Sequence, residues 1–203
     1  MNADEAVTAA SAGSAPRSEG WDARRALVVY ESLWGNTERV ARAIARELEL
    51  RMTVVIENAE TAPTVLDGFD LVIAGGPTHA FSMSRASTRQ AAVLNNAAPR
   101  VVDRGLREWL DRVLPVPRPI AAAAFDTRVD SPRLPGSAAK AARHELRSRG
   151  FDVRAKARTF RVHGYEGPLL DGELDGAAEW VRELLREIPP PAPAASHEHR
   201  ADR

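Results

Sequence analysis

Short apolar runs alternate with helical stripes along most of the chain. The stretches whose apolar character predicts a strand are 26–31, 52–57, 70–75, 120–125 and roughly 151–162. After the first run, apolar residues return at helical spacing from Val40 to Leu48, and a similar stripe from Val102 to Val113 precedes the fourth run. Five strands separated by helices predict an α/β protein in which one parallel sheet is covered by helices on both faces.

The last two helices have well-marked ends. An alanine-rich run over 137–149 stops at Gly150, which is typical of a helix C-terminus. The final amphipathic stripe, over 174–188, stops at Pro189 because proline cannot continue a helix. We therefore place one folded domain at residues 21–188.

Both ends of the chain lack hydrophobic periodicity. Residues 1–20 are rich in Ala, Ser and Gly, and residues 189–203 begin with a run of prolines. These compositions predict a disordered N-terminal arm and a disordered Pro-rich tail. The tail holds His197 and His199, which we expect to be solvated rather than to bind a metal.

A turn rich in hydroxyl, amide and glycine groups, residues 32–37, joins the first strand to its helix. A tight strand-to-helix turn directs backbone N–H groups and the positive end of the helix dipole to one place, which suits a phosphate. Neither G-x-x-x-x-G-K-[ST] nor G-x-G-x-x-G is present. Ser32, Asn36 and Thr37 around Gly35 instead fit one compact phosphate. The alternative is an ordinary turn in which Asn36 or Thr37 only caps the helix.

The segment after the third strand carries a second group of candidate residues. In a parallel sheet, ligands bind beyond the carboxyl ends of the strands. Two glycines and a proline over 75–84 predict a tight turn with exposed backbone amides. His79 and Phe81 place flat side chains where a planar ring system fits, and Thr78 adds a donor. The alternatives are a surface histidine and a phenylalanine that anchors the loop.

The segment after the fourth strand offers a third group. Asp126 and Thr127 are placed to hydrogen-bond the polar edge of a heterocycle, and Arg128 brings positive charge. An ordinary polar loop is the alternative.

The composition excludes several classes of protein. Lys+Arg and Asp+Glu balance at 28 each, so no nucleic-acid partner is expected. The absence of cysteine removes disulfides, thiolate catalysis and cysteine-held metal clusters. No apolar run approaches membrane-spanning length, and the first twenty residues lack the apolar core of a secretory signal. We expect a soluble cytoplasmic protein.

Two motifs, V-V-Y-E-S-L-W-G-N-T-E-R-V-A and D-L-V-I-A-G-G-P-T-H-A-F, resemble the phosphate loop and the second flavin loop of the flavodoxin-like family. The resemblance covers most of residues 25–188. It implies a three-layer sandwich with a five-stranded parallel sheet in the order 2-1-3-4-5, which binds FMN without covalent attachment. By position, it implies that the FMN phosphate is held by Ser32, Leu33, Trp34, Gly35, Asn36 and Thr37. It implies that the isoalloxazine ring is lined by Gly76, Pro77, Thr78, His79 and Phe81, with Asp126, Thr127 and Arg128 beside its far edge.

The chain also departs from the family pattern. Trp34 stands where short-chain flavodoxins usually have a threonine, so one hydroxyl contact is missing. Asp126 replaces the glycine that generally follows the phenylalanine in the third loop. Electron-carrier flavodoxins are typically strongly acidic, whereas this chain is neutral. Residues 82–100 are longer than a simple loop and hold Arg85 and Arg89; a lid, a dimer contact and an anion site are the alternatives.

The resemblance makes a flavoprotein in electron transfer the leading hypothesis, with a redox partner protein or a small-molecule electron acceptor. One alternative is an FMN-dependent NAD(P)H/quinone reductase, an oxidoreductase that needs open space over the flavin and usually a homodimer. The other is a flavodoxin-like interaction module without flavin. No nucleophile–base pair stands out, so we name no catalytic residue, and hydrolase or transferase chemistry has no support.

Overall fold

The computed structural model describes residues 24–133 and 135–187 of the 203-residue chain. The arm expected at 1–20 and the tail expected at 189–203, with His197 and His199, lie outside the described residues.

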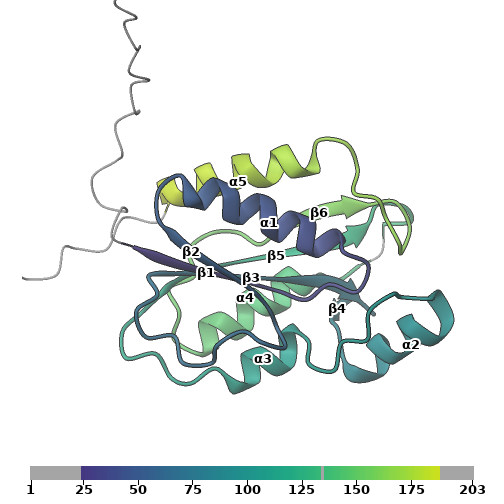
Figure 1. Cartoon of the computed structure of the whole chain (residues 1–203), viewed down its shortest axis with the longest axis horizontal. Helices are drawn as coiled ribbons and strands as arrows, with labels where there is room; N and C mark the ends of the chain where they lie inside the picture. The colour runs from purple at the N-terminus through teal and green to yellow at the C-terminus, as the bar shows by residue number, and fades with distance from the viewer. Residues whose placement is uncertain (1–23, 134, 188–203) are drawn as a thin grey trace, which may run out of the picture.

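One sheet forms the centre of the described structure (Figure 1). Its strands are β1 (Arg25–Tyr30), β2 (Thr53–Asn58), β3 (Leu71–His79), β4 (Ser82–Met83), β5 (Ala121–Val129) and β6 (Arg158–Val162). Five of them run parallel in the order β2-β1-β3-β5-β6, and the short β4 pairs antiparallel with β3. Counted along the chain without β4, this is the order 2-1-3-4-5. The predicted α/β architecture is therefore confirmed, with one additional strand.

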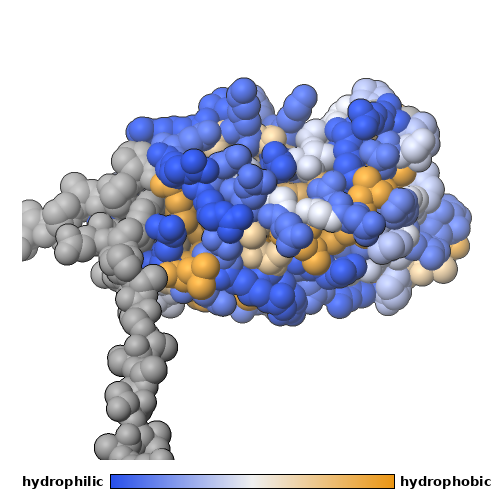
Figure 2. Space-filling view, turned by 90° about the horizontal axis from the view of Figure 1, so that it is seen from above, coloured by the Kyte–Doolittle hydropathy of each residue, from blue (hydrophilic) through white to orange (hydrophobic). Residues whose placement is uncertain are grey.

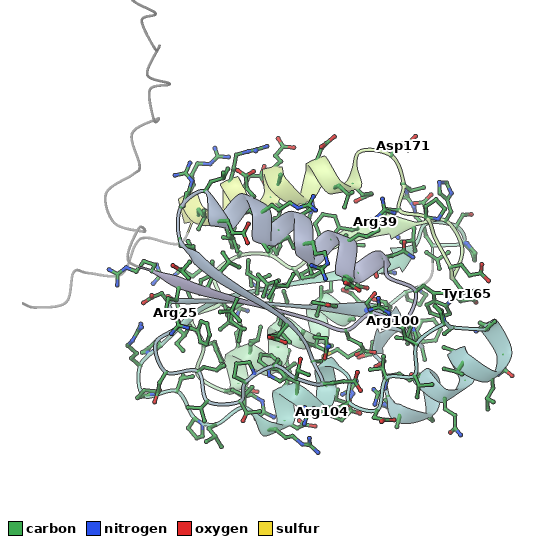
Figure 3. The ribbon with its side chains drawn as sticks, viewed as in Figure 1. Arg25, Arg39, Arg100, Arg104, Tyr165 and Asp171 are labelled. Carbon is green, nitrogen blue, oxygen red and sulfur yellow. The ribbon has the colours of Figure 1, made fainter. Side chains whose placement is uncertain are left out.

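Helices cover both faces of the sheet. They are α1 (Asn36–Glu49), α2 (Ala86–Asn96), α3 (Leu106–Arg112), α4 (Ala138–Ser148) and α5 (Glu173–Glu187). Figure 1 shows α1 and α5 on one face, α3 and α4 on the other, and α2 near β4. Figure 2 looks down on the face covered by α1 and α5, whose surface is mostly hydrophilic. No helix among the described residues is long and apolar enough to cross a membrane.

Alternating side chains along the strands supply two separate apolar cores. Ala26 and Val28 of β1 face α1 and α5, whereas Leu27 and Val29 face α3 and α4, and all four are fully buried. A strand buried on both faces has a continuous apolar sequence, and this is why β1 could be predicted from the sequence. The two cores fix both helix layers on the sheet and leave the carboxyl ends of the strands open for a site.

The structure corrects the predicted strand ends. The turn expected over 75–84 is mostly strand, because β3 continues to His79 and only Ala80 and Phe81 form the turn into β4. Pro77 is tolerated there because β1 already ends at Tyr30, so its missing N–H interrupts no ladder on that side.

The third predicted loop is also strand. β5 runs on to Val129 because β6 pairs with its second half, from Phe125 onward. The last strand, expected over roughly 151–162, is confined to Arg158–Val162; before it, Asp152 makes an isolated bridge to Ala121.

A close contact between Gly75 and Phe125 fixes the middle of the sheet. Gly75 pairs with Tyr30 on one side and with Phe125 on the other. The ring of Phe125 lies across the backbone of Gly75, where any Cβ would overlap it. The same ring packs edge-on against Phe160 and Trp180, with centroids 6.0 and 6.4 Å away. Gly75 is therefore required by the aromatic cluster that holds α5 to the sheet.

We predict that Gly75→Ala lowers the free energy of unfolding by about 1–3 kcal/mol, because the new methyl group overpacks against Phe125. In a Phe125→Leu background the same change should cost clearly less. Gly176→Ala is the matched control: it places a methyl group in helix α5 with only ordinary contact, 3.8 Å from Arg158, and should stabilise by up to about 1 kcal/mol. Urea denaturation of the single and double variants measures these changes in the free energy of unfolding. If Gly75→Ala lowered the free energy of unfolding equally in both backgrounds, overlap with the Phe125 ring would not be the cause.

Candidate functional site

A cavity of about 350 Å³ opens at the carboxyl ends of β1, β3 and β5. The residues singled out in the sequence that line it are Ser32, Leu33, Trp34, Asn36, Thr37, Pro77, Thr78, His79, Phe81, Thr127 and Arg128. Gly35, Gly76 and Asp126 lie outside its lining. Segments some ninety residues apart thus meet at one place, because parallel strands end at the same edge of the sheet.

The segment between β1 and α1 forms a cradle of backbone donors. Gly35 adopts a left-handed conformation (φ 88°) and α1 begins directly after it. The Gly35 N–H donates to Ser32 Oγ over 3.1 Å, which closes the turn. The N–H groups of Asn36, Thr37 and Glu38 find no acceptor among the described residues. Since the first N–H groups of a helix have no intrahelical partner, they are available to an anion.

The polar side chains of this cradle are largely occupied within the protein. Asn36 Nδ2 donates to the carbonyl of Glu166 over 2.8 Å. Thr37 and Thr127 share a hydrogen bond between their hydroxyl oxygens, 2.7 Å apart. Ser32 Oγ accepts from Gly35, so its own proton stays available. An anion here would therefore meet mainly backbone N–H groups, with fewer side-chain donors than the sequence suggested.

Asp126 serves the scaffold beneath the cavity. Its side chain is fully buried, and its Oδ2 accepts from Thr78 Oγ1 (2.8 Å), Ser137 Oγ (2.6 Å) and the Ala139 N–H (3.0 Å). The carboxylate thereby holds the first turn of α4 against β3. Because β5 continues as a strand, Asp126 and its neighbour Thr127 point to opposite faces, and only Thr127 reaches the cavity.

Aromatic side chains form one wall. The rings of Trp34 and His79 lie 6.0 Å apart at 53°. Burial, and secondarily the charge of Arg89, lowers the pKa of His79 from 6.5 to about 4, so its imidazole is neutral at neutral pH. Trp34 Nε1 is buried and has no hydrogen-bond partner among the described residues. Phe81, in the turn before β4, has a positive φ of 71° and stays 54% exposed beside the cavity.

Helix α2 supplies a wall that the sequence did not specify. Thr88, Ala91, Ala92 and Asn96 line the cavity from this helix, and Tyr165 lines it from the connection after β6. The sequence did indicate an additional feature here, because the segment 82–100 is longer than a simple loop. The pattern within it did not reveal a helix, because only two of the residues in α2, Arg89 and Ala92, are buried.

A buried charged network anchors α2. Arg89 is 2% exposed and donates from Nε to the carbonyl of Val102 (2.8 Å) and from Nη1 to Ser84 Oγ (2.9 Å) and Glu108 (3.1 Å). Ser84 in turn donates to the carboxylate of Glu31, whose pKa is raised by burial. The guanidinium of Arg89 is thus hydrogen-bonded within the fold. It is therefore not available to bind an anion, which was one of the alternatives for residues 82–100. The network ties the α2 wall to the end of β1.

A scan against models of known protein families finds no match. Solved structures do resemble this chain. A flavodoxin from the domain Archaea superimposes with a TM-score of 0.54 at 17% sequence identity, covering 80% of this chain and 96% of that one. Oxidised Flavodoxin 1 from Bacillus cereus superimposes with a TM-score of 0.58 at 16% sequence identity, covering 81% of this chain and 99% of that one. The flavodiiron core Flv1 from Synechocystis sp. PCC6803 superimposes with a TM-score of 0.54 at 19% sequence identity, covering 81% of this chain and 36% of that one.

The superpositions with the two flavodoxins cover four-fifths of this chain and nearly the whole of each flavodoxin. At identities below 20%, this likeness concerns the fold. We conclude that this protein has the flavodoxin-like fold.

Proposed function

We propose that this protein binds FMN in the cavity at the carboxyl ends of β1, β3 and β5 and acts in electron transfer. The observation that carries the proposal is the set of unpartnered N–H groups at the start of α1, beside a cavity with a flat aromatic wall. The similar structures named as flavodoxins support it at the level of the fold.

The residues present fit the parts of FMN. The N–H groups of Asn36 and Thr37, with the hydroxyl of Ser32, suit the phosphate. The buried Trp34 Nε1 is a donor without an acceptor, and a ligand oxygen would satisfy it. The cavity volume lies within the range usual for small-molecule sites. FMN would supply the redox chemistry, and the protein would set its affinity, its potential and its access to a partner.

The first test is an absorption spectrum of the purified full-length protein, before and after FMN is added and the excess removed. A retained flavin spectrum supports the proposal. A protein that stays colourless after reconstitution refutes it and favours the flavin-less interaction module.

We predict that Gly35→Asp weakens FMN binding by about tenfold or more, because a carboxylate would face the phosphate at the helix N-terminus. Gly172→Asp is the matched control: both glycines have φ near +80° to +90°, precede a helix, and leave open space for a Cβ. Fluorescence titration with FMN and with riboflavin measures the effect. The loss should be confined to Gly35→Asp and to FMN; an equal loss for riboflavin would place the phosphate elsewhere.

Arg128 lines the cavity from the end of β5. A nearby guanidinium favours an anionic reduced flavin. We predict that Arg128→Ala lowers the midpoint potential of bound FMN by roughly 30–60 mV, which is the one-electron equivalent of about 0.7–1.4 kcal/mol. Arg161→Ala is the control, because Arg161 pairs with Arg128 in register on β6 but does not line the cavity. Spectroelectrochemical titration decides, and an unchanged or higher potential in Arg128→Ala rejects this role.

His79 should add a pH dependence to stability. Its folded pKa of about 4 lies below the usual 6.5, so between these values the unfolded chain binds more protons than the folded one. Its contribution to stability is therefore complete above pH 6.5 and is lost as the pH falls towards 4. We predict that His79→Gln flattens this decline by up to about 3 kcal/mol. Urea denaturation between pH 7 and pH 4.5 compares the two proteins, and parallel profiles would contradict a buried neutral imidazole.

A small-molecule reductase is the second candidate, and the α2 wall is the observation that favours it. Thr88, Ala91 and Asn96 add a side to the cavity that could enclose a small acceptor. Steady NADH or NADPH consumption with a quinone, by protein loaded with FMN, would support this function. Single-turnover oxidation without steady consumption would favour a carrier.

A further inference from the structure

The neutral chain carries an uneven distribution of charge. Residues 80–149 hold 13 Lys+Arg and 6 Asp+Glu, although the whole chain balances at 28 of each. This segment comprises α2, α3, α4 and β5, and therefore one helix layer together with the α2 wall of the cavity (Figure 1). Helix α5, in the opposite layer, holds 2 Arg and 5 Asp+Glu. We call α2, α3 and α4 with their connections the basic layer, because segment 80–149 carries seven more basic than acidic residues. Long-range attraction depends on this local balance rather than on net charge.

Several arginines of the basic layer are fixed without being neutralised. Four of them donate to backbone carbonyls: Arg104 to Ala59 (3.2 Å), Arg107 to Met83 (3.1 Å), Arg143 to Ala155 (2.8 Å) and Arg147 to Val153 (2.8 Å). A carbonyl orients a guanidinium but has no net charge to cancel it. Each of these side chains is therefore held in place with its positive charge retained.

Ion pairs cancel part of the charge on both sides of the sheet. On the side of α1 and α5, Arg42 pairs with Glu38 over 2.8 Å. On the other side, Arg149 pairs with Asp111 over 3.0 Å. The positive potential around α2, α3 and α4 therefore rests on the excess of basic residues in segment 80–149 and on those arginines that are held only by carbonyls.

Exposed apolar side chains mark where this basic surface meets the cavity. Phe81 and Tyr165 both line the cavity and are 54% and 65% exposed, and Leu94 on α2 is 74% exposed. Basic residues lie next to cavity-bordering segments in the chain: Arg85 directly precedes α2, and Arg133 follows Pro132, which lines the cavity. Both are exposed; Arg133 approaches Asp130 only at 3.8 Å, a contact that solvent weakens. An apolar centre with a charged rim is the usual anatomy of a protein-docking surface.

We propose that the cavity mouth, bounded by α2 and the β5–α4 connection, docks an acidic electron-carrier protein. The role as an electron-transfer surface rests on FMN binding as proposed above. Positive charge on the α2–α4 layer steers the carboxylate-rich partner towards the mouth, and Phe81 and Tyr165 provide the contact at the edge of the cavity.

A protein fits this surface better than a nucleic acid does. Asp103, Asp111 and Asp130 interrupt the basic layer and would meet the evenly repeated charge of a sugar–phosphate backbone with repulsion. The exposed aromatic rings also gather at the cavity, which an electron carrier must approach closely.

The test is an NMR titration of the ¹⁵N-labelled full-length protein with FMN present. The probes are an acidic plant-type [2Fe–2S] ferredoxin, basic horse-heart cytochrome c and a single-stranded DNA oligonucleotide, each at low and at about 0.15 M ionic strength. The charge-reversal variant is Arg85→Glu/Arg133→Glu. The matched control is Arg46→Glu/Arg186→Glu, which changes the net charge equally at exposed positions of α1 and α5.

We expect saturable shifts in α2 and around Phe81 with ferredoxin, weaker at the higher salt. Arg85→Glu/Arg133→Glu should weaken this binding by about tenfold or more, and the control pair by about twofold or less. Equal binding of ferredoxin and cytochrome c, tighter binding of DNA, or equal losses in both variants would overturn the proposal.

A repeat of the titration without FMN separates the two proposals. If the flavin spectrum shows no bound FMN and ferredoxin still docks at this face, the docking surface stands and the electron-transfer function falls. If FMN is retained and ferredoxin does not dock, FMN binding stands and the docking surface falls.

Discussion

The register in which β1, β3 and β5 pair is the constraint on which the rest of the molecule depends. Tyr30, Gly75 and Phe125 lie side by side across these three strands, so all three leave the sheet at the same edge. The ring of Phe125 over Gly75 also reaches Trp180 and thereby joins the sheet to α5. A shift of one residue would turn every core side chain to the wrong face and separate the segments that line the cavity.

A second constraint holds the wall that distinguishes this cavity. Arg89 and Glu31 are almost fully buried, and charged groups in that position are costly unless they are paired and hydrogen-bonded. Here Ser84 bridges the two side chains, and the backbone of Val102 and Leu106 completes their hydrogen bonds. Because removal of one partner would leave a buried charge unsatisfied, the network specifies where α2 lies and keeps that side of the cavity in place.

The cavity and the charge distribution support one consistent picture of function. The start of α1 offers unpartnered N–H groups to an anion, and the aromatic wall of Trp34 and His79 suits a planar ring. Within the basic segment 80–149, helix α2 and the connection between β5 and α4 border the same cavity. The neutral net charge conceals an uneven distribution of charge along the chain, and the docking proposal rests on that distribution.

Much of the fold could be predicted from the sequence, because apolar spacing and helix-ending residues act locally. The strands, α1, α4, α5 and the parallel sheet follow from patterns such as the buried run of β1 and the stop at Gly150. Most of the candidate site residues also line one cavity, since parallel strands bring their carboxyl ends together.

Local patterns could not show where β3 and β5 end, because neighbouring strands decide that: β4 prolongs β3, and β6 prolongs β5. Periodicity along the chain was enough to predict most of the elements, their order and which strand ends could meet, but it missed α2 and β4. The packing of the fold, in contrast, sets that Asp126 holds α4, that Thr37 bonds Thr127 and that Arg89 anchors α2. A polar side chain bonds whichever partners the fold brings to it, and those partners lie up to 130 residues away along the chain, as Glu166 does from Asn36.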